Sequence, residues 1–289
     1  MPRSQALGTI AALFYIFLWA SAYVPSKIGV LESSPLWFLV VRFAVSGALA
    51  LGVALALGAR PPRTVRMWLL LGLLGALNNA VYLGCTYEAL RHLATGIGAI
   101  LASMNPLLLA LVAPAVLAEP LTRTKIAGLV LGFAGVVAIM FARIGSGTAE
   151  PGDVALALTG VVGSVAATVI FKKYVTQVDL RITTGVQLLA ASVVLLPLAI
   201  VFEGAPHARW SPQLIGSFAY LVFVISIGAS TLWFWLLSKG EASRVSAFYF
   251  LTPVFGLALG ALLLHEHVGV HDLFGLVAIA LGIFLVQRA

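Results

Sequence analysis

Ten long apolar segments occupy most of this 289-residue chain and restrict what it can fold into. Only 9% of its residues are charged, against roughly 25% in soluble globular proteins, and 61% are hydrophobic. A soluble fold cannot bury so much apolar surface, whereas a membrane-spanning helix needs about 20 apolar residues. The segments therefore predict helices that each cross a bilayer once, at residues 5–25, 36–58, 67–89, 96–118, 126–142, 154–171, 182–201, 214–237, 245–264 and 273–287.

The remaining residues suffice only for short loops and tails, which excludes a sizeable soluble domain. No period-two alternation repeats along the chain, so we expect an all-α integral membrane protein rather than a β-barrel. A single cysteine, Cys85, excludes an internal disulfide and a metal–thiolate site.

Lys and Arg residues are distributed unequally among the predicted loops. With the N-terminus inside, twelve lie on the cytoplasmic side and four on the opposite side, while Arg42 lies within the second segment. The positive-inside rule therefore predicts that both termini are cytoplasmic. The net charge of +7 is explained by this asymmetry, which leaves no support for a nucleic-acid partner.

The two halves of the chain resemble each other. An offset of 147 residues aligns a proline, a glutamate and two glycines, namely Pro106 with Pro253, Glu119 with Glu266, Gly128 with Gly275 and Gly135 with Gly282. Because each half has five helices, the second repeat (150–289) enters the membrane from the side opposite to the first (1–145). Inverted repeats place a substrate site between the halves near mid-membrane, and exchanging their conformations opens it to each side in turn. The symmetry predicts a transporter.

Each half closes with a mid-helix proline, a glutamate ending that helix and a helix rich in small residues, at 106–140 and 253–285. In these marks the chain resembles the EamA-type unit of the drug/metabolite transporter superfamily, over essentially its whole length. Its size and two-unit layout are similar to the YddG-type amino acid exporters. The resemblance implies ten helices with both termini inside and the export of amino acids or other small metabolites.

Polar side chains within spanning segments are the candidate site residues, because each costs free energy unless it is paired or faces water. Asn78 and Asn79, with Tyr82 one turn later, can hydrogen-bond a zwitterion without adding charge, or can instead bridge to a neighbouring helix. Ser226, Ser230 and Trp233 share one face of the eighth segment. The other polar and aromatic candidates for substrate binding are Trp19, Ser21, Tyr23, Asn105, Ser164, Thr168, Phe248 and Tyr249.

Pro106 and Pro253 form a repeat-related pair. A proline inside a helix removes a backbone donor and frees a carbonyl, which is tolerable in a membrane only beside protein or cavity water. We expect these prolines either to act as gating hinges or to make static kinks for packing.

All ten carboxylates, from Glu32 to Asp272, fall in loops or at helix ends. A proton-coupled exporter of cations usually needs a buried acid, and none is evident. The one charge within a segment, Arg42, is expected to extend outward to the membrane surface, with contact to a substrate carboxylate as the alternative. The run His265, Glu266, His267 with His271 resembles a zinc site only weakly, so no metal and no cofactor are predicted.

These features predict an alternating-access exporter of small neutral or zwitterionic metabolites, amino acids including aromatic ones, in a bacterial-type inner membrane and without ion coupling. The alternatives are a multidrug or cationic-amine exporter, which the missing central acid disfavours, and a sugar-phosphate or nucleotide-sugar carrier, which the lone Arg42 disfavours. No catalytic motif indicates an enzyme. Faces of small residues around Gly128, Gly132 and Gly135 pack helices within the bundle or in a dimer, so the sequence leaves monomer and homodimer open.

Overall fold

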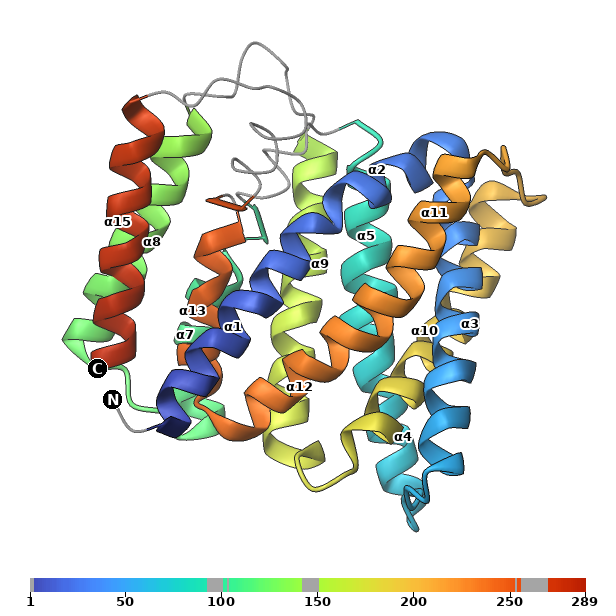
Figure 1. Cartoon of the computed structure of the whole chain (residues 1–289), viewed down its shortest axis with the longest axis horizontal. Helices are drawn as coiled ribbons and strands as arrows, with labels where there is room; N and C mark the ends of the chain where they lie inside the picture. The colour runs from blue at the N-terminus through green and yellow to red at the C-terminus, as the bar shows by residue number, and fades with distance from the viewer. Residues whose placement is uncertain (1–2, 93–100, 103, 142–150, 253, 256–269) are drawn as a thin grey trace.

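The computed structural model describes residues 3–92, 101–102, 104–141, 151–252, 254–255 and 270–289, which form a helical bundle (Figure 1). Its α-helices are α1 (Arg3–Ser21), α2 (Tyr23–Glu32), α3 (Pro35–Ala56), α4 (Val65–Gly75), α5 (Tyr82–Ala89), α7 (Asn105–Leu117), α8 (Arg123–Phe141), α9 (Pro151–Ile170), α10 (Leu180–Glu203), α11 (Pro212–Tyr220), α12 (Ser230–Lys239), α13 (Ala242–Ala247) and α15 (Val270–Arg288). Three π-helical segments and one 3₁₀ segment join or extend them, namely η1 (Ala76–Val81), η2 (Phe171–Val175), η3 (Leu221–Ala229) and the 3₁₀ segment η4 (Phe248–Leu251).

Six helices in the described part of the chain are long and apolar enough to cross a membrane, at Leu7–Glu32, Pro35–Ala56, Val65–Ala89, Pro151–Val175, Leu180–Glu203 and Pro212–Lys239. Asn105–Leu117 and Phe274–Arg288 are shorter apolar helices. The first span continues past its predicted end at residue 25. A short turn at Ala22 separates α1 from α2, and Pro25 lies in the first turn of α2, where a proline is tolerated, so it does not end the span. The predicted segments 96–118 and 245–264 are described only in part.

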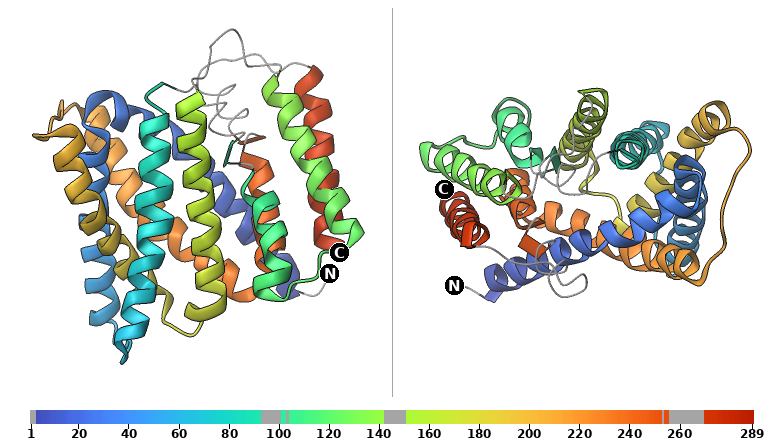
Figure 2. Two further views of the ribbon diagram at one scale, coloured as in Figure 1. Left: turned by 180° about the vertical axis from the view of Figure 1, so that it is seen from behind. Right: turned by 90° about the horizontal axis from the view of Figure 1, so that it is seen from above.

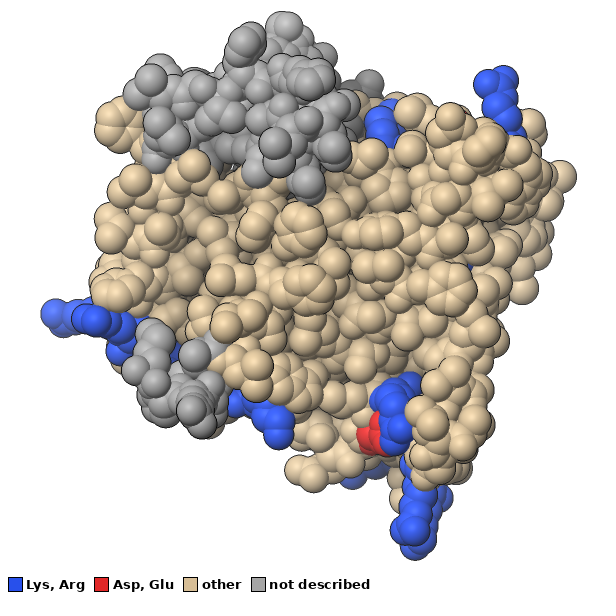
Figure 3. Space-filling model, viewed as in Figure 1, with Lys and Arg blue, Asp and Glu red and all other residues tan. Residues whose placement is uncertain are grey.

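The outer surface of the bundle is apolar. Large hydrophobic side chains are exposed along several helices, such as Phe202, which is 75% exposed. On the face in Figure 3, an uncharged band separates Lys and Arg side chains at the end that holds both termini from those at the other end. We call these ends the terminal side and the opposite side. Such a band matches the hydrocarbon core of a bilayer, which confirms the prediction of an all-helical membrane protein.

Two close helix pairs stand at the two ends of the long axis, α8 with α15 and α3 with α10 (Figure 2). A Cβ atom added at Gly135 would lie 2.7 Å from the carbonyl oxygen of Gly275, and one at Gly128 would lie 2.6 Å from that of Gly282. Small residues permit this close approach of two backbones. The small-residue faces expected from the sequence therefore pack α8 and α15 against each other.

The π-helical segments η1 and η3 interrupt two of the spanning helices. The offset of 147 residues found in the sequence places residues 76–81 at 223–228, which lie within η3. A π turn is wider than an α turn and redirects side chains, and it occurs often at functional sites. In η1 the redirection brings both Asn78 and Asn79 to Gln187 of α10, although adjacent residues of a regular helix face different directions.

We expect Gly75→Ala to destabilise the protein and Gly72→Ala, in the same helix, to leave it at least as stable as before. A Cβ atom at Gly75 would collide with the backbone carbonyl of Gln187, whereas one at Gly72 meets nothing within 4 Å. Overpacking typically costs about 1–3 kcal/mol, which outweighs the gain of about 1 kcal/mol in helix propensity. Melting temperatures in detergent measure the difference. Equal values for both variants would show that α4 and α10 do not approach at Gly75.

Candidate functional site

A closed cavity lies between the middle parts of several helices, and we call it the central cavity. Its wall consists of aromatic rings, amides, hydroxyls, one guanidinium and two aliphatic side chains, from Tyr15, Trp19, Arg42, Asn78, Asn79, Tyr82, Leu83, Ile225, Ser226, Ser230, Trp233 and Tyr249. The lining thus comes from both halves of the chain. The volume is about 20 Å³, room for roughly one water molecule. A solute of amino-acid size enters only when these walls separate.

Five aromatic rings form one cluster around this cavity. Tyr15 stacks on Trp19 and on Trp233, with ring centroids 6.1 and 5.1 Å apart. Trp19 stacks in turn on Tyr82 at 6.1 Å, with the planes 11° apart. The hydroxyl of Tyr249 is hydrogen-bonded to that of Tyr15 at 2.6 Å, which joins α1 to η4. Such rings offer large apolar faces with polar edges to a bound molecule.

Two amides of η1 reach across the cavity wall to α10. Asn79 Nδ2 donates a hydrogen bond to Gln187 Oε1 at 3.0 Å, and Asn78 Nδ2 lies 3.5 Å from the same oxygen. The Gln187 Nε2 atom is buried without a partner among the described residues. Asn79 therefore does both of the things that the sequence left open, since it bridges two helices and also lines the cavity.

Arg42 does not extend to the membrane surface, so that expectation is wrong. The side chain is 2% exposed. Its Nε donates to Ser226 Oγ and its Nη1 to the Tyr87 hydroxyl, both at 2.9 Å. The Tyr87 hydroxyl donates onward to Ser26 Oγ at 2.8 Å. Hydroxyls of α5 and η3 accept hydrogen bonds from the guanidinium, and a hydroxyl of α2 accepts one from Tyr87. The guanidinium therefore does not need to reach water.

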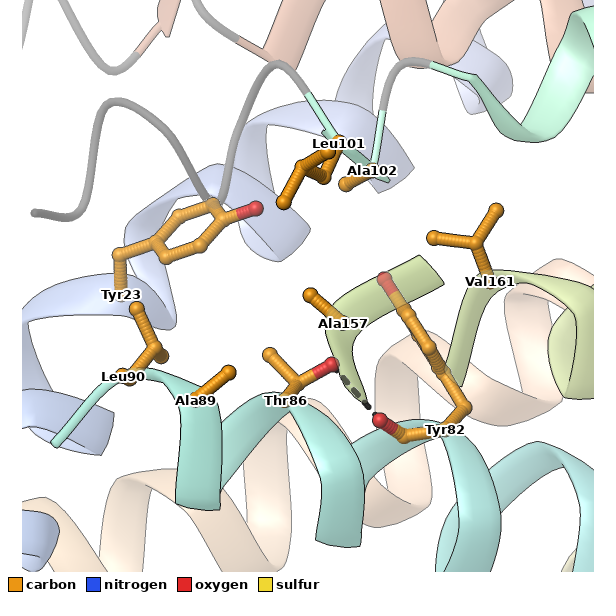
Figure 4. Close-up of a pocket in the computed structure, with 9 residues that line it drawn as sticks. All are labelled: Tyr23, Tyr82, Thr86, Ala89, Leu90, Leu101, Ala102, Ala157 and Val161. Carbon is orange, nitrogen blue, oxygen red and sulfur yellow. Dashed lines mark hydrogen bonds between the residues drawn. The ribbon is translucent and has the colours of Figure 1, made fainter. Parts of the chain in front are cut away.

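Two further cavities adjoin the central cavity on the side facing the opposite side of the bundle, with volumes of about 40 and about 20 Å³. Tyr82 lines all three cavities. Figure 4 shows the smaller one, where Tyr23 reaches from α2 toward Leu101 and the Tyr82 ring stands between Ala157 and Val161 of α9. The predicted site residue Tyr23 thus lies beside the central cavity, on its path to the opposite side.

Charged groups on the terminal side join the end of α7 to the start of α13. The Glu119 carboxylate accepts hydrogen bonds from the backbone N–H groups of Ala242 and Ser243, at 2.7 and 3.1 Å, and from the Ser243 hydroxyl at 2.5 Å. A carboxylate is favourable at the N-terminus of a helix. Lys125, only 1% exposed, pairs with Glu241 at 3.1 Å. This network ties the two halves together on the terminal side.

Several sequence-predicted residues lie outside the central cavity, and they bond or pack within the bundle: Ser21, Asn105, Ser164, Thr168 and Phe248. Ser21 Oγ lies 2.5 Å from the Tyr220 hydroxyl. Asn105 Nδ2 donates to Ser164 Oγ at 3.1 Å, and Thr168 Oγ1 donates to the Ser164 carbonyl at 3.0 Å. Phe248 belongs to the hydrophobic core. Polar groups bonded in this way hold helices together.

Pro106 lies in the first turn of α7, which begins at Asn105, so it does not kink the middle of a continuous helix as the sequence suggested. A proline is tolerated there, since the first N–H groups of a helix have no partner within it. Pro253, His265, Glu266 and His267 lie outside the described residues.

Two polar residues at the site were not predicted, namely Tyr15 of the cavity lining and Gln187, which binds Asn79, and neither were the aliphatic lining residues Leu83 and Ile225. Tyr15 precedes Trp19 by four residues and so shares its helix face, which was a usable signal. Gln187 is an amide inside a predicted span, as Asn78 and Asn79 are, and the same rule for polar groups in membranes identifies it.

An apolar helical bundle with a closed polar cavity at its centre defines a multi-pass membrane protein. The EamA-like transporter family matches the chain twice, over residues 6–141 and 153–288, and the chain belongs to this family.

Similar proteins are named as transporters. Uncharacterized transporter YvbV of Bacillus subtilis (strain 168) is 31% identical over 288 residues, which cover 99% of this chain and 93% of that one. The Probable amino-acid metabolite efflux pump of Salmonella typhimurium is 25% identical, over 95% of this chain and 92% of that one. A solved crystal structure shares the fold, with a TM-score of 0.80 and 20% identity over 98% of this chain and 97% of that chain.

We expect Glu119→Ala to open the terminal side. The change leaves the N–H groups of Ala242 and Ser243 without their acceptor, and hydrogen bonds to a charged group are worth about 1.5–3 kcal/mol. Ser246 of α13 is fully buried, so a cysteine placed there, with Cys85 replaced by serine, reports the opening. A water-soluble maleimide should label it roughly tenfold faster in Glu119→Ala.

Asp179→Asn is the matched control, because the Asp179 carboxylate pairs with Arg181 at the surface of the terminal side. It should leave labelling unchanged. The same labelling rate with and without Glu119 would show that this network does not hold the terminal side closed.

Proposed function

We propose that this protein exports small neutral or zwitterionic metabolites, amino acids including aromatic ones, across the cytoplasmic membrane by alternating access. The central cavity carries the proposal, because rings, amides and hydroxyls of both halves surround one small volume. Apolar walls with a few polar groups are typical of small-molecule sites. Amides and hydroxyls bond both charges of a zwitterion and require no proton exchange. The name of the Salmonella typhimurium relative, a probable amino-acid metabolite efflux pump, agrees with this substrate class.

The proposed architecture has ten membrane helices, as two inverted repeats over residues 1–145 and 150–289, with both termini cytoplasmic. The two separate family matches, at 6–141 and 153–288, support the duplication. The duplication is also supported by η1 and η3, because the repeat offset places η1 within η3.

Two lysines give further support for the duplication, since they bind equivalent helix ends on the two sides of the bundle. Lys27 Nζ donates to the Leu90 carbonyl at 2.8 Å, and Lys172 Nζ donates to the Leu237 carbonyl at 2.8 Å. An offset of 147 residues relates the two leucines, and one of 145 relates the lysines. A lysine near a helix C-terminus satisfies carbonyls that have no partner within the helix.

The difference between the two sides supports alternating access. The Glu119 network holds the terminal side closed, while small cavities lead from the centre to the opposite side. When the halves exchange conformations, the terminal side opens and the opposite side closes. Pro106, in the first turn of α7, is the proposed hinge in the first half, with Pro253 as its partner.

Export of cationic amines fits this cavity less well. Among the described residues that line it there is no carboxylate, and Arg42 adds a positive charge. A sugar-phosphate carrier would need several cations, and Arg42 is the one cationic side chain in the described lining.

Purified protein in liposomes should take up several labelled amino acids, phenylalanine and tryptophan included, and an imposed proton gradient should not change the rate. The reason is that the described lining of the cavity has no acid to titrate. Gradient-dependent uptake would identify a coupled pump instead. Glu88, whose Oε1 is buried and has no partner among the described residues, would be the first group to replace. Folded protein that takes up no amino acid would reject the proposal.

Asn79→Ala and Tyr82→Leu should each change the preference among amino acids by roughly fivefold to tenfold, since each removes a wall group worth about 1 kcal/mol. Relative KM values measure the preference. Both variants should still express and fold, although Asn79→Ala should lower the melting temperature because it removes the buried hydrogen bond to Gln187. Thr159→Ala, at an exposed position of α9, is the control. An equal loss for every substrate with poor expression would indicate a structural role only.

A further inference from the structure

We propose that Arg42 is the receptor for a carboxylate in the central cavity, so that the transported solutes are carboxylic acids with an apolar or aromatic body. The inference rests on the proposed transport function. It restricts the substrates to solutes with a carboxylate and adds simple carboxylate anions to the zwitterions.

The first observation is that Arg42 is a buried charge without a counter-charge. No carboxylate lies within ion-pairing distance of it among the described residues. Its two hydrogen-bond partners, Ser226 and Tyr87, are neutral hydroxyls, and its Nη2 has no partner in the described part of the chain. Lys125, equally buried on the terminal side, does have an anionic partner in Glu241. Buried charges in proteins are normally paired, and one inside a membrane marks a functional site.

The second observation is the place of Arg42 on the path through the bundle. It lines the central cavity and also the cavity of about 40 Å³ that continues toward the opposite side. A solute that passes from one to the other meets the guanidinium. A guanidinium binds a carboxylate through two parallel hydrogen bonds, which gives strength and a fixed orientation.

The third observation is that the guanidinium is held in place from several helices. Ser226 of η3 binds Nε, Tyr87 of α5 binds Nη1, and Ser26 of α2 accepts the Tyr87 proton. The Phe43 ring centroid lies 5.4 Å from Cζ. Two nitrogens are thereby fixed by neutral groups, which leave the charge itself uncompensated. Tyr87 and Ser226 are positioning residues for Arg42.

The rest of the described lining indicates that the part of the solute beyond its carboxylate is apolar or aromatic. The five-ring cluster of Tyr15, Trp19, Tyr82, Trp233 and Tyr249 shares the central cavity with Arg42 and offers stacking faces. The described lining has no acidic side chain to pair with an ammonium group, which would meet only amide and hydroxyl oxygens and ring faces. The carboxylate is therefore required for binding, and the amino group is not.

The test begins with the unmodified protein and four probes of similar size, phenylalanine, 3-phenylpropionate, phenylalaninamide and 2-phenylethylamine. Each is added to purified protein, and the rise in melting temperature and the competition with labelled phenylalanine uptake are measured. We expect the two carboxylates to stabilise the protein and to compete, and the amide and the amine to be at least tenfold weaker. An amide that binds as tightly as the acid would overturn the role of Arg42 and leave the transport function standing. Folded protein that binds neither carboxylate would overturn this inference.

Variants then assign the effect to the guanidinium. Arg42→Gln should raise KM for phenylalanine at least tenfold and remove the discrimination between acid and amide, and Arg42→Lys should restore part of it. Tyr87→Phe, which keeps the ring and removes the hydroxyl, should weaken discrimination less. Arg91→Gln is the matched control, because Arg91 is exposed and pairs with Glu88 on the opposite side. Unchanged discrimination in Arg42→Gln would falsify the inference, and if that variant does not fold, the probe series on the unmodified protein decides.

Discussion

The absence of water from the bilayer core is the constraint on which this structure depends. Backbone groups that cannot bond to water must bond within a helix, which is why the described chain is helical throughout its apolar segments. Polar side chains obey the same rule, as Asn105 with Ser164 and Asn79 with Gln187 demonstrate. A few buried polar atoms, such as Gln187 Nε2 and Thr252 Oγ1, have no hydrogen-bond partner among the described residues.

The two sides of the bundle are closed by different forces. On the terminal side a carboxylate, a lysine and a helix N-terminus make charge-assisted hydrogen bonds, through Glu119, Lys125 and Ser243. Toward the opposite side, aromatic and aliphatic side chains around Tyr23 and Tyr82 leave small gaps. Hydrogen bonds depend steeply on geometry, whereas apolar contacts are non-directional. In the proposed transport cycle, the terminal side therefore opens at a definite point, while the opposite side adjusts gradually.

Hydropathy alone predicted the helical class and the six long spans, because apolar runs of that length have no other stable arrangement in a bilayer. The rule that polar and aromatic residues within spans are site candidates correctly identified Trp19, Asn79 and Tyr249, which line the central cavity. It did not distinguish them from Asn105 and Ser164, which bond to each other instead. That distinction depends on partners far away in the sequence. The burial of Arg42 likewise depends on Tyr87 and Ser226, 45 and 184 residues away. The π-helical segments have no pattern that single-sequence periodicity detects.

The small size of the central cavity has a consequence for the energetics of loading. A site with about 20 Å³ of free volume has to expand before a molecule of amino-acid size fits in it, so the proposed loading step carries a positive activation volume. Hydrostatic pressure opposes states that contain more void. Lateral compression by a tightly packed, ordered bilayer opposes the expansion in the same way. The rate of the proposed transport would therefore be set in part by the fluidity of the membrane around the protein.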